Sequence, residues 1–232
     1  MSAAGRRAPD HGRFGRNHTT IVQRAIQEAG CRRNGACAQF SENHMASILL
    51  APPAVEPLSL AEAKVFLRLE MADDDPLIAA LISAARLHVE TQTGLALVTQ
   101  RWRMVLDCWP VNGRIAARPA PLQALVAARV FDFDGEARTI DAQTFVPNAS
   151  TSTLSIIPWA LPMPTRIAAG IEIDIAVGFG DAASDVPEPI RQAIRLLVAH
   201  WYENRAIVAG SEAAPVPSHA AALIAPYRTL PL

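Results

Sequence analysis

The sequence predicts an α+β protein, a small helical bundle of three to four helices with an inserted small antiparallel β unit. Apolar residues recur at helical spacing between residues 59 and 93, and again between residues 185 and 206. From Thr99 the apolar period changes to two, which is typical of half-buried strands. The prolines bunch between residues 110 and 190, as expected of loops and short strands. The expected strands therefore lie between helices in the chain.

The first two expected helices begin at strong start signals. Ser59 and Glu62 form a capping box, in which the hydroxyl accepts from a first-turn amide and the carboxylate reaches back to the amide of Ser59. Residues 73–75 are three aspartates directly before Pro76. We interpret them as a cap at the positive end of the helix dipole rather than as a metal site. Gly94 then supplies a left-handed end to the second helix.

Two further helices are expected near the C-terminus. The third begins at residues 185–188, and a short fourth is capped by Ser218 and stops before Pro226. The apolar stripes of the long helices predict a shared structural core. Its expected members are Leu77, Leu81, Ile190, Ile194, Leu197 and Trp201.

The β unit is predicted from the alternation of apolar and polar residues and from turn-forming residues. Apolar and polar residues alternate over residues 101–107 and, most regularly, over residues 171–177. Asp134-Gly135 separates two strand-like runs and predicts a hairpin, because this dipeptide tolerates positive φ. Leu154 and Ile156 indicate one more short strand.

These elements divide the chain into five expected parts. Residues 1–44 are a disordered arm or an extension placed upstream of a true start at Met45, and both readings stay open. The other expected parts are an N-terminal helical part at 45–98, the inserted β unit at 99–180, a C-terminal helical part at 185–226 and an extended tail at 227–232.

Composition and charge exclude several classes of protein. The 232 residues are 50% hydrophobic and 19% charged, which excludes a wholly disordered chain. Residues 1–44 hold seven arginines against three acidic residues, a net +4. Since the whole chain carries −1, residues 45–232 carry −5, so strong nucleic-acid binding by that part is not expected. No apolar run reaches the roughly 18 residues that span a bilayer, so no membrane partner is expected.

The cysteines indicate neither a disulfide framework nor a metal site. Cys31, Cys37 and Cys108 are odd in number, which favours a reducing compartment. Cys31, Cys37 and His44 do not have zinc-ligand spacing. We therefore expect no metal and no cofactor.

No motif in the chain predicts catalysis convincingly. Residues 178–181, Gly-Phe-Gly-Asp, follow a strand but lack the third glycine, the lysine and the Ser/Thr of nucleotide-binding loops, so we interpret them as a turn. His200 and Glu203 lie three apart on one helix, where they share a face. A helical histidine without a nearby nucleophile is usually structural, and we expect no enzyme activity.

The order of short motifs resembles a known family, the head-tail connector or adaptor proteins of long-tailed phages and phage-derived gene transfer agents. The resembling stretches cover about residues 58 to 228, and their joint order is specific although each is weak alone. They are Leu58-Ser59-Leu60-Ala61-Glu62-Ala63-Lys64, Asp75-Pro76-Leu77-Ile78-Ala79-Ala80-Leu81-Ile82 with Glu90-x-x-Thr93-Gly94, Thr99-Gln100-Arg101-Trp102, Asp107-x-Trp109-Pro110, Val177-Gly178-Phe179-Gly180 with Val186-Pro187, Ala199-His200-Trp201-Tyr202-Glu203-Asn204-Arg205 and Ala225-Pro226-Tyr227-Arg228.

The resemblance implies a non-enzymatic structural part of a virion or phage-like particle. Such adaptors look like ring subunits, twelve to a ring, that bind the portal protein and join it to the next tail component, a stopper or tail terminator. DNA would pass through the lumen without specific binding. The implied location is the neck of the particle, after synthesis in the bacterial cytoplasm. The portal-binding residues implied are Tyr227, Arg228, Thr229, Leu230, Pro231 and Leu232.

Two alternative functions remain at this point. The basic segment 1–44 would suit a nucleic-acid-binding regulator. A small hydrolase would use His200 and Glu203, provided that a nucleophile lies within hydrogen-bond reach. Neither alternative accounts for the order of the motifs.

Overall fold

The fold is mixed α+β and is seen in a computed structural model that describes residues 46–204 and 217–228. All of these residues belong to one unit, residues 44–232. The helices are α2 (Leu60–Leu67), α3 (Asp75–Thr93), α4 (Glu188–Glu203) and α5 (Ser218–Ile224). The strands are β1 (Ala46–Ala51), β2 (Gln100–Leu106), β3 (Arg114–Ala116), β4 (Leu122–Phe131), β5 (Ala137–Ile140), β6 (Val146–Asn148), β7 (Thr153–Ser155) and β8 (Ile171–Val177).

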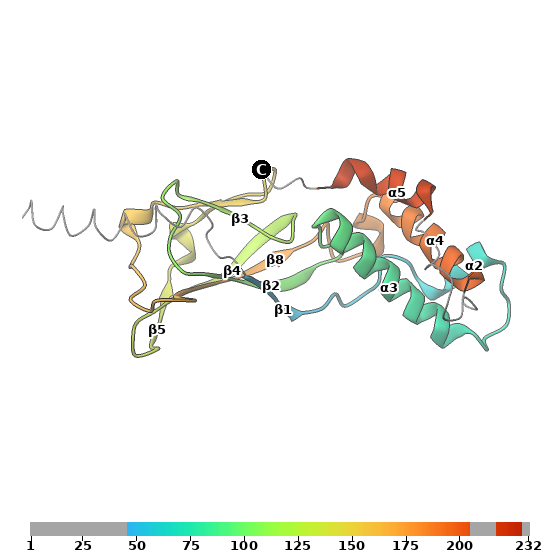
Figure 1. Cartoon of the computed structure of the whole chain (residues 1–232), viewed down its shortest axis with the longest axis horizontal. Helices are drawn as coiled ribbons and strands as arrows, with labels where there is room; N and C mark the ends of the chain where they lie inside the picture. Colours follow the sequence, from blue (N-terminus) through green and yellow to red (C-terminus); the bar gives the residue numbers. More distant parts are fainter. Residues whose placement is uncertain (1–45, 205–216, 229–232) are drawn as a thin grey trace, which may run out of the picture. The chain divides into compact units, whose positions relative to one another are not determined.

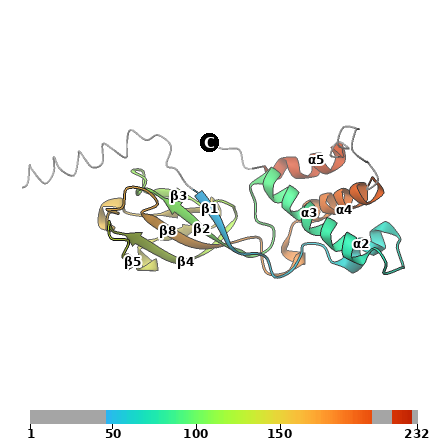
Figure 2. The same cartoon turned by 60° about the horizontal axis from the view of Figure 1, so that its bottom comes forward.

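The strands form two antiparallel sheets that face each other (Figures 1 and 2). The larger has the order β1-β2-β8-β4-β5, and the smaller has the order β3-β7-β6. The alternation over residues 171–177 places β8 at the centre of the large sheet, where Ile171, Ile173, Ile175 and Val177 are fully buried. The opposite face of β8 carries Glu172 and Asp174. One face of this sheet therefore packs on the core, as the alternation predicts.

The β portion is larger than a small insertion, and it includes a strand from before the first helix. Residues 46–51 form β1, which pairs with β2 at the edge of the large sheet. These residues were expected in the N-terminal helical part, and the pairing of β1 corrects that expectation. Strand membership depends here on a partner 50 or more residues away, so local periodicity could not reveal it.

The hairpin prediction is confirmed. β4 and β5 pair as antiparallel neighbours, and Gly135 in their turn has φ +84°. The carboxylate of Asp132 accepts from the amides of Asp134 and Glu136, so a side chain also holds this turn closed.

The helical start signals are largely confirmed. The Ser59 and Glu62 capping box is present in both directions, and Gly94 ends α3 in the left-handed conformation with φ +72°. Pro76 lies in the first turn of α3, but the N-cap residue Asp74 makes no side-chain cap hydrogen bond. The prediction for α5 was wrong in one detail, because Pro217 is its N-cap and Ser218 is its first residue.

The helices lie beside one another (Figure 2), and they bury an apolar core separate from that of the sheets. Ile190, Ile194 and Leu197 of α4 are fully buried there, as predicted. Leu77 is 37% exposed, so its assignment to the core was wrong. Its neighbour Ile78 has the inward position instead, because adjacent helical residues point about 100° apart. Leu81 and Trp201 are only partly buried and pack at the margin of the core.

Candidate functional site

The candidate site is a groove at the C-terminal end of α3. Beyond Gly94 the chain runs beside residues 117–121, and two backbone hydrogen bonds join them: Ala96 N to Ala120 O, and Ala120 N to Gly94 O. The groove has a volume of about 900 Å³ and a mainly apolar lining. It is bordered by the last turns of α3, residues 116–121, residues 149–153, Phe179 and Tyr227.

Residues from separate motifs of the sequence analysis meet in this groove. Its lining includes Glu90, Gly94, Gln100, Trp102, Phe179 and Tyr227, which come from three regions of the sequence: residues 90–102, residue 179 and residue 227. Four of the motifs that carry the family resemblance therefore contribute residues to one groove. The shared groove is a structural reason for these motifs to occur together, and their spacing in the sequence does not reveal it.

Glu90 is the polar centre of the groove wall. Its Oε1 accepts from the amide of Leu97 at 3.0 Å and from Nε2 of Gln100 at 2.6 Å, and its Oε2 accepts from Nη1 of Arg86 at 2.8 Å. Burial raises the pKa of Glu90, although these hydrogen bonds and the charge of Arg86 act in the opposite direction. Because the three donors come from α3 and from the segment entering β2, Glu90 ties the end of α3 to the large sheet.

The network extends on both sides of Glu90. Gln100 Oε1 accepts from Nε1 of Trp102 at 3.0 Å, which holds the indole at the groove wall. On the other side, Nε of Arg86 donates to Oε2 of Glu56 at 2.8 Å. Arg86 is a buried arginine, 8% exposed, so its two carboxylate partners compensate a charge that would be costly alone.

Sequence reasoning included Glu90 in a motif but did not assign it a role. The available signal was its position in the last turn of α3, which contains no basic residue. A carboxylate is unfavourable at the negative end of a helix dipole. A carboxylate at this position is expected to accept hydrogen bonds from specific donors, and Glu90 accepts them from Arg86, Leu97 and Gln100.

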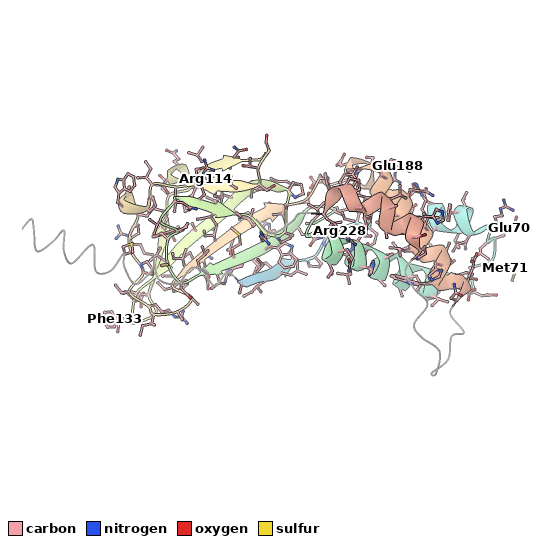
Figure 3. The ribbon with its side chains drawn as sticks, turned by 45° about the horizontal axis from the view of Figure 1, so that its top comes forward. Glu70, Met71, Arg114, Phe133, Glu188 and Arg228 are labelled. Atoms are coloured by element: carbon pink, nitrogen blue, oxygen red, sulfur yellow. The ribbon has the colours of Figure 1, made fainter. Side chains whose placement is uncertain are left out.

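Tyr227 and Arg228 do not leave the domain as an extended segment, which corrects that expectation. Residues Ala225–Tyr227 form a 3-10 turn (η4), and Tyr227 is half-buried against the helical core. Nη2 of Arg228, a residue labelled in Figure 3, donates to Oε1 of Gln92 at 3.2 Å. Pro226 has no amide to continue the α-helix, but it lies at the start of the 3-10 turn, whose hydrogen bond is donated by the amide of Arg228 to the carbonyl of Ala225. Thr229, Leu230, Pro231 and Leu232 lie outside the described residues.

The structure does not join His200 and Glu203 into a pair. Nδ1 of His200 lies 3.2 Å from Nδ2 of Asn204, and Glu203 is exposed. Among the described residues, no group of three or more His, Cys, Asp or Glu side chains could hold a metal ion. Cys31, Cys37, His44 and the basic segment 1–44 lie outside the described residues.

Comparison with known proteins gives matches among solved structures. No protein-family model and no curated protein matches the chain. One solved chain comes from the "Virion of native gene transfer agent (GTA) particle", with 26% identity and a TM-score of 0.67, covering 80% of this chain and 96% of that one. A second comes from the "Neck of empty GTA particle computed with C6 symmetry", with 27% identity, a TM-score of 0.64, and coverage of 81% and 96%. A third comes from the "Neck of native GTA particle computed with C12 symmetry", with 27% identity, a TM-score of 0.62, and coverage of 80% and 97%.

The fold and these matches define a class, the neck-type structural proteins of phage-like and gene transfer agent particles. The location of the chain is accordingly the virion neck. Within residues 46–204 and 217–228, no helix has the length and apolar character that crossing a bilayer requires.

Proposed function

We propose that the chain is the adaptor of a head-tail neck, a ring subunit that binds the portal protein and joins it to the next tail component. The observation that carries the proposal is the match with a chain of a neck of C12 symmetry, of which 97% is covered at 27% identity. Coverage of nearly the whole neighbour supports a corresponding role, because little of that chain lacks a counterpart here. The next component would be a stopper or a tail terminator.

The ring would be dodecameric and would surround the DNA channel. A ring requires a heterologous contact, in which one surface of a subunit meets a different surface of its neighbour. Residues 45–232 carry a net charge of −5, which suits a lumen that DNA passes without specific binding. In this proposal residues 99–180 together with β1 supply the β unit, residues 52–98 and 185–226 the helical parts, and residues 1–44 an arm.

The portal-binding segment would begin after Arg228. Tyr227 is half-buried and Arg228 is bound to Gln92, so the chain has an anchored point from which a short tail starts. Thr229, Leu230, Pro231 and Leu232 carry two leucines and no charged side chain. A short apolar segment of this kind can place alternate side chains in pockets of a partner. Twelve such tails on one ring would bind with avidity even if each is weak.

Removal of residues 229–232 tests the proposal. We expect a chain ending at Arg228 to fold with an unchanged melting temperature and to give DNA-filled heads without tails in a producing strain, because Tyr227 and its packing are kept. Leu230→Ala combined with Leu232→Ala should have the same effect. Thr229→Ala is the matched control and should give tailed particles. Normal tailed particles from the truncated chain, or a truncated chain that misfolds, would refute this role of the tail.

A further inference from the structure

Helix α3 has a second apolar face, which is exposed. Its buried face is centred on Ile78, Ile82 and Val89. The opposite side has the alternating spacing of three and four residues that is typical of the seam between two packed helices. Leu77 and Leu87 on this side are 37% and 53% exposed. The members of this outer face are Leu77, Ala80, Ala84, Leu87 and Thr91, and all of them are exposed.

The outer face of α3 also carries no charge. From Pro76 to Thr93 the helix contains two charged residues, Arg86 and Glu90, and these pair with each other in the interior at 2.8 Å. The exposed side of a surface helix normally carries charged and polar residues. An exposed side with two leucines, two alanines and no charge has the composition of a contact between helices.

Helix α2 has an exposed apolar face of a different shape. Val65 and Phe66 are 79% and 40% exposed, and together with Ala61 they line an open, mainly apolar hollow of about 400 Å³. The charged residues at this hollow, Glu62 and Arg195, lie 3.9 Å apart and so partly compensate each other. Large side chains thus project from α2, whereas the middle of the outer face of α3 is made of small ones.

The two faces match in length as well as in shape. Ala61 and Val65 are four residues apart on α2, and Ala80 and Ala84 are four residues apart on α3, so each pair spans about 6 Å of helix. If the helices run antiparallel, Val65 lies over Ala80 when Ala61 lies over Ala84. Projecting residues of one helix then fit between the leucines of the other, which is ridges-into-grooves packing.

The antiparallel direction also brings two opposite charges together. Arg68 is exposed at the C-cap of α2, and Asp73 is exposed just before α3, four residues ahead of Leu77. Within the described part of the chain, no ion pair engages either side chain. With Val65 over Ala80, the end of α2 points toward the start of α3, and the long side chain of Arg68 can reach Asp73 of the other molecule.

We propose that a second copy of this chain covers the outer face of α3 with its helix α2, and that this contact builds the ring. The inference deepens the proposed function and rests on its ring assembly. Each subunit of a ring needs two different contact surfaces, one for each neighbour. The outer faces of α2 and α3 are two such surfaces on one subunit. Because neither face buries an unpaired charge in the contact, the costly term in such interfaces is avoided.

Cross-linking in purified particles tests the contact. A chain with Val65→Cys and Ala80→Cys, oxidised within particles from a producing strain, should give a ladder of covalent oligomers on a non-reducing gel. Each single variant, and the wild type with its three native cysteines, should give no ladder. Ala79→Cys in place of Ala80→Cys is the matched control, because Ala79 is exposed on the same helix but points about 100° away.

A lysine on the outer face tests its role in assembly. Ala80→Lys should lower the amount of the chain found in particles by about tenfold or more, because the lysine would be buried without a partner. Its melting temperature should match that of the wild type, since Ala80 is exposed in the single subunit. Ala79→Lys should enter particles normally.

A charge exchange tests the direction of the helices. Arg68→Asp and Asp73→Arg should each lower the yield of the cross-linked ladder by about two- to fivefold, and the two together should restore it, because the pair is re-formed with reversed signs. A double variant weaker than both single ones would overturn the antiparallel contact.

The remaining outcomes separate this inference from the adaptor function. If the double-cysteine chain is present in tailed particles and gives no ladder, or if Ala79→Cys gives the same ladder, the contact is refuted although the adaptor function stands. A covalent dimer from Val65→Cys alone or Ala80→Cys alone would show two-fold pairing of one face and would also refute it. If the wild-type chain is absent from the particles, the adaptor function is refuted, and the contact with it.

Discussion

Asp174 is the most constrained ionic residue of the large sheet. It is 7% exposed on β8, and it lies between Arg103 of β2 and Arg129 of β4. Its carboxylate accepts from Nε and Nη2 of Arg103 at 2.6 and 3.0 Å and from Nη1 of Arg129 at 2.9 Å. Burial acts to raise the pKa of Asp174, but the two arginines outweigh it and lower the pKa below its usual value.

Asp174→Asn should destabilise the fold by about 1.5–3 kcal/mol at neutral pH, because both arginines lose a charged partner. Since the folded pKa is below the unfolded one, the stabilisation by the carboxylate is complete above about pH 4. It is lost as the pH falls through the folded pKa. The difference between wild type and variant should therefore shrink below about pH 4 in urea unfolding series.

Asp181→Asn is the control for this prediction, because Asp181 is an exposed carboxylate in the loop after β8. It should change stability by no more than about 0.5 kcal/mol at any pH. A stability difference for Asp174→Asn that stays constant down to pH 2 would show that the pKa of Asp174 is not lowered in the fold.

At the scale of elements, Gly178 fixes how β8 leaves the large sheet. Its φ is +134°, a conformation that side chains with a Cβ rarely adopt. A Cβ there would lie 2.7 Å from the carbonyl carbon of Val98 and 2.8 Å from the amide nitrogen of Thr99. The turn expected at residues 178–181 is therefore also a close crossing of two backbones. This requirement explains the glycine without any phosphate-binding role.

Gly178→Ala should cost about 3 kcal/mol or more, because both the conformation and the contact are unfavourable and the neighbouring atoms are backbone. Gly135→Ala is the matched control. Gly135 also has positive φ, +84°, but no atom lies within 4 Å of its Cβ position, so about 1 kcal/mol of backbone strain is expected. Equal losses in denaturant unfolding for the two variants would contradict the close crossing at Gly178.

At the scale of the whole molecule, the chain that begins at Met45 should be as stable as the full chain. β1 begins at Ala46, so every described element is kept. Residues 1–44 offer few apolar side chains to a core. The melting temperatures of the two chains should agree. A decrease of about 4 °C or more in the shorter chain, equivalent to at least about 1 kcal/mol, would show that residues 1–44 pack on the fold.

Features with a local cause could be predicted well. The capping box at Ser59, the left-handed Gly94, the hairpin at Gly135 and the alternation of β8 each depend on residues within one or two turns or on one strand. Their physical causes are capping, backbone freedom and burial of one face. Such signals are complete in the sequence itself.

Features that depend on distant partners could not be predicted. β1 was not recognised as a strand of the sheet, because its six residues show no alternation and its pairing with β2 spans the whole of α2 and α3. Leu77 was expected in the core because helical spacing alone does not decide which of two adjacent apolar residues, Leu77 or Ile78, lies at the centre of the buried face of α3. Only the packing of α3 against α4 and α5 decides that Ile78 is inside and Leu77 is not.

The sequence by itself determined the α+β class, most element boundaries and the resemblance to neck adaptors. It contained the residues of the groove, Glu90, Gln100, Trp102 and Tyr227, in separate motifs. Only the tertiary structure decided that these residues share one groove, and that β1 and β5 are the two open edges of one sheet. The physical reason is that local sequence specifies dihedral angles and burial patterns, whereas strand order and the meeting of distant motifs follow from packing the whole chain.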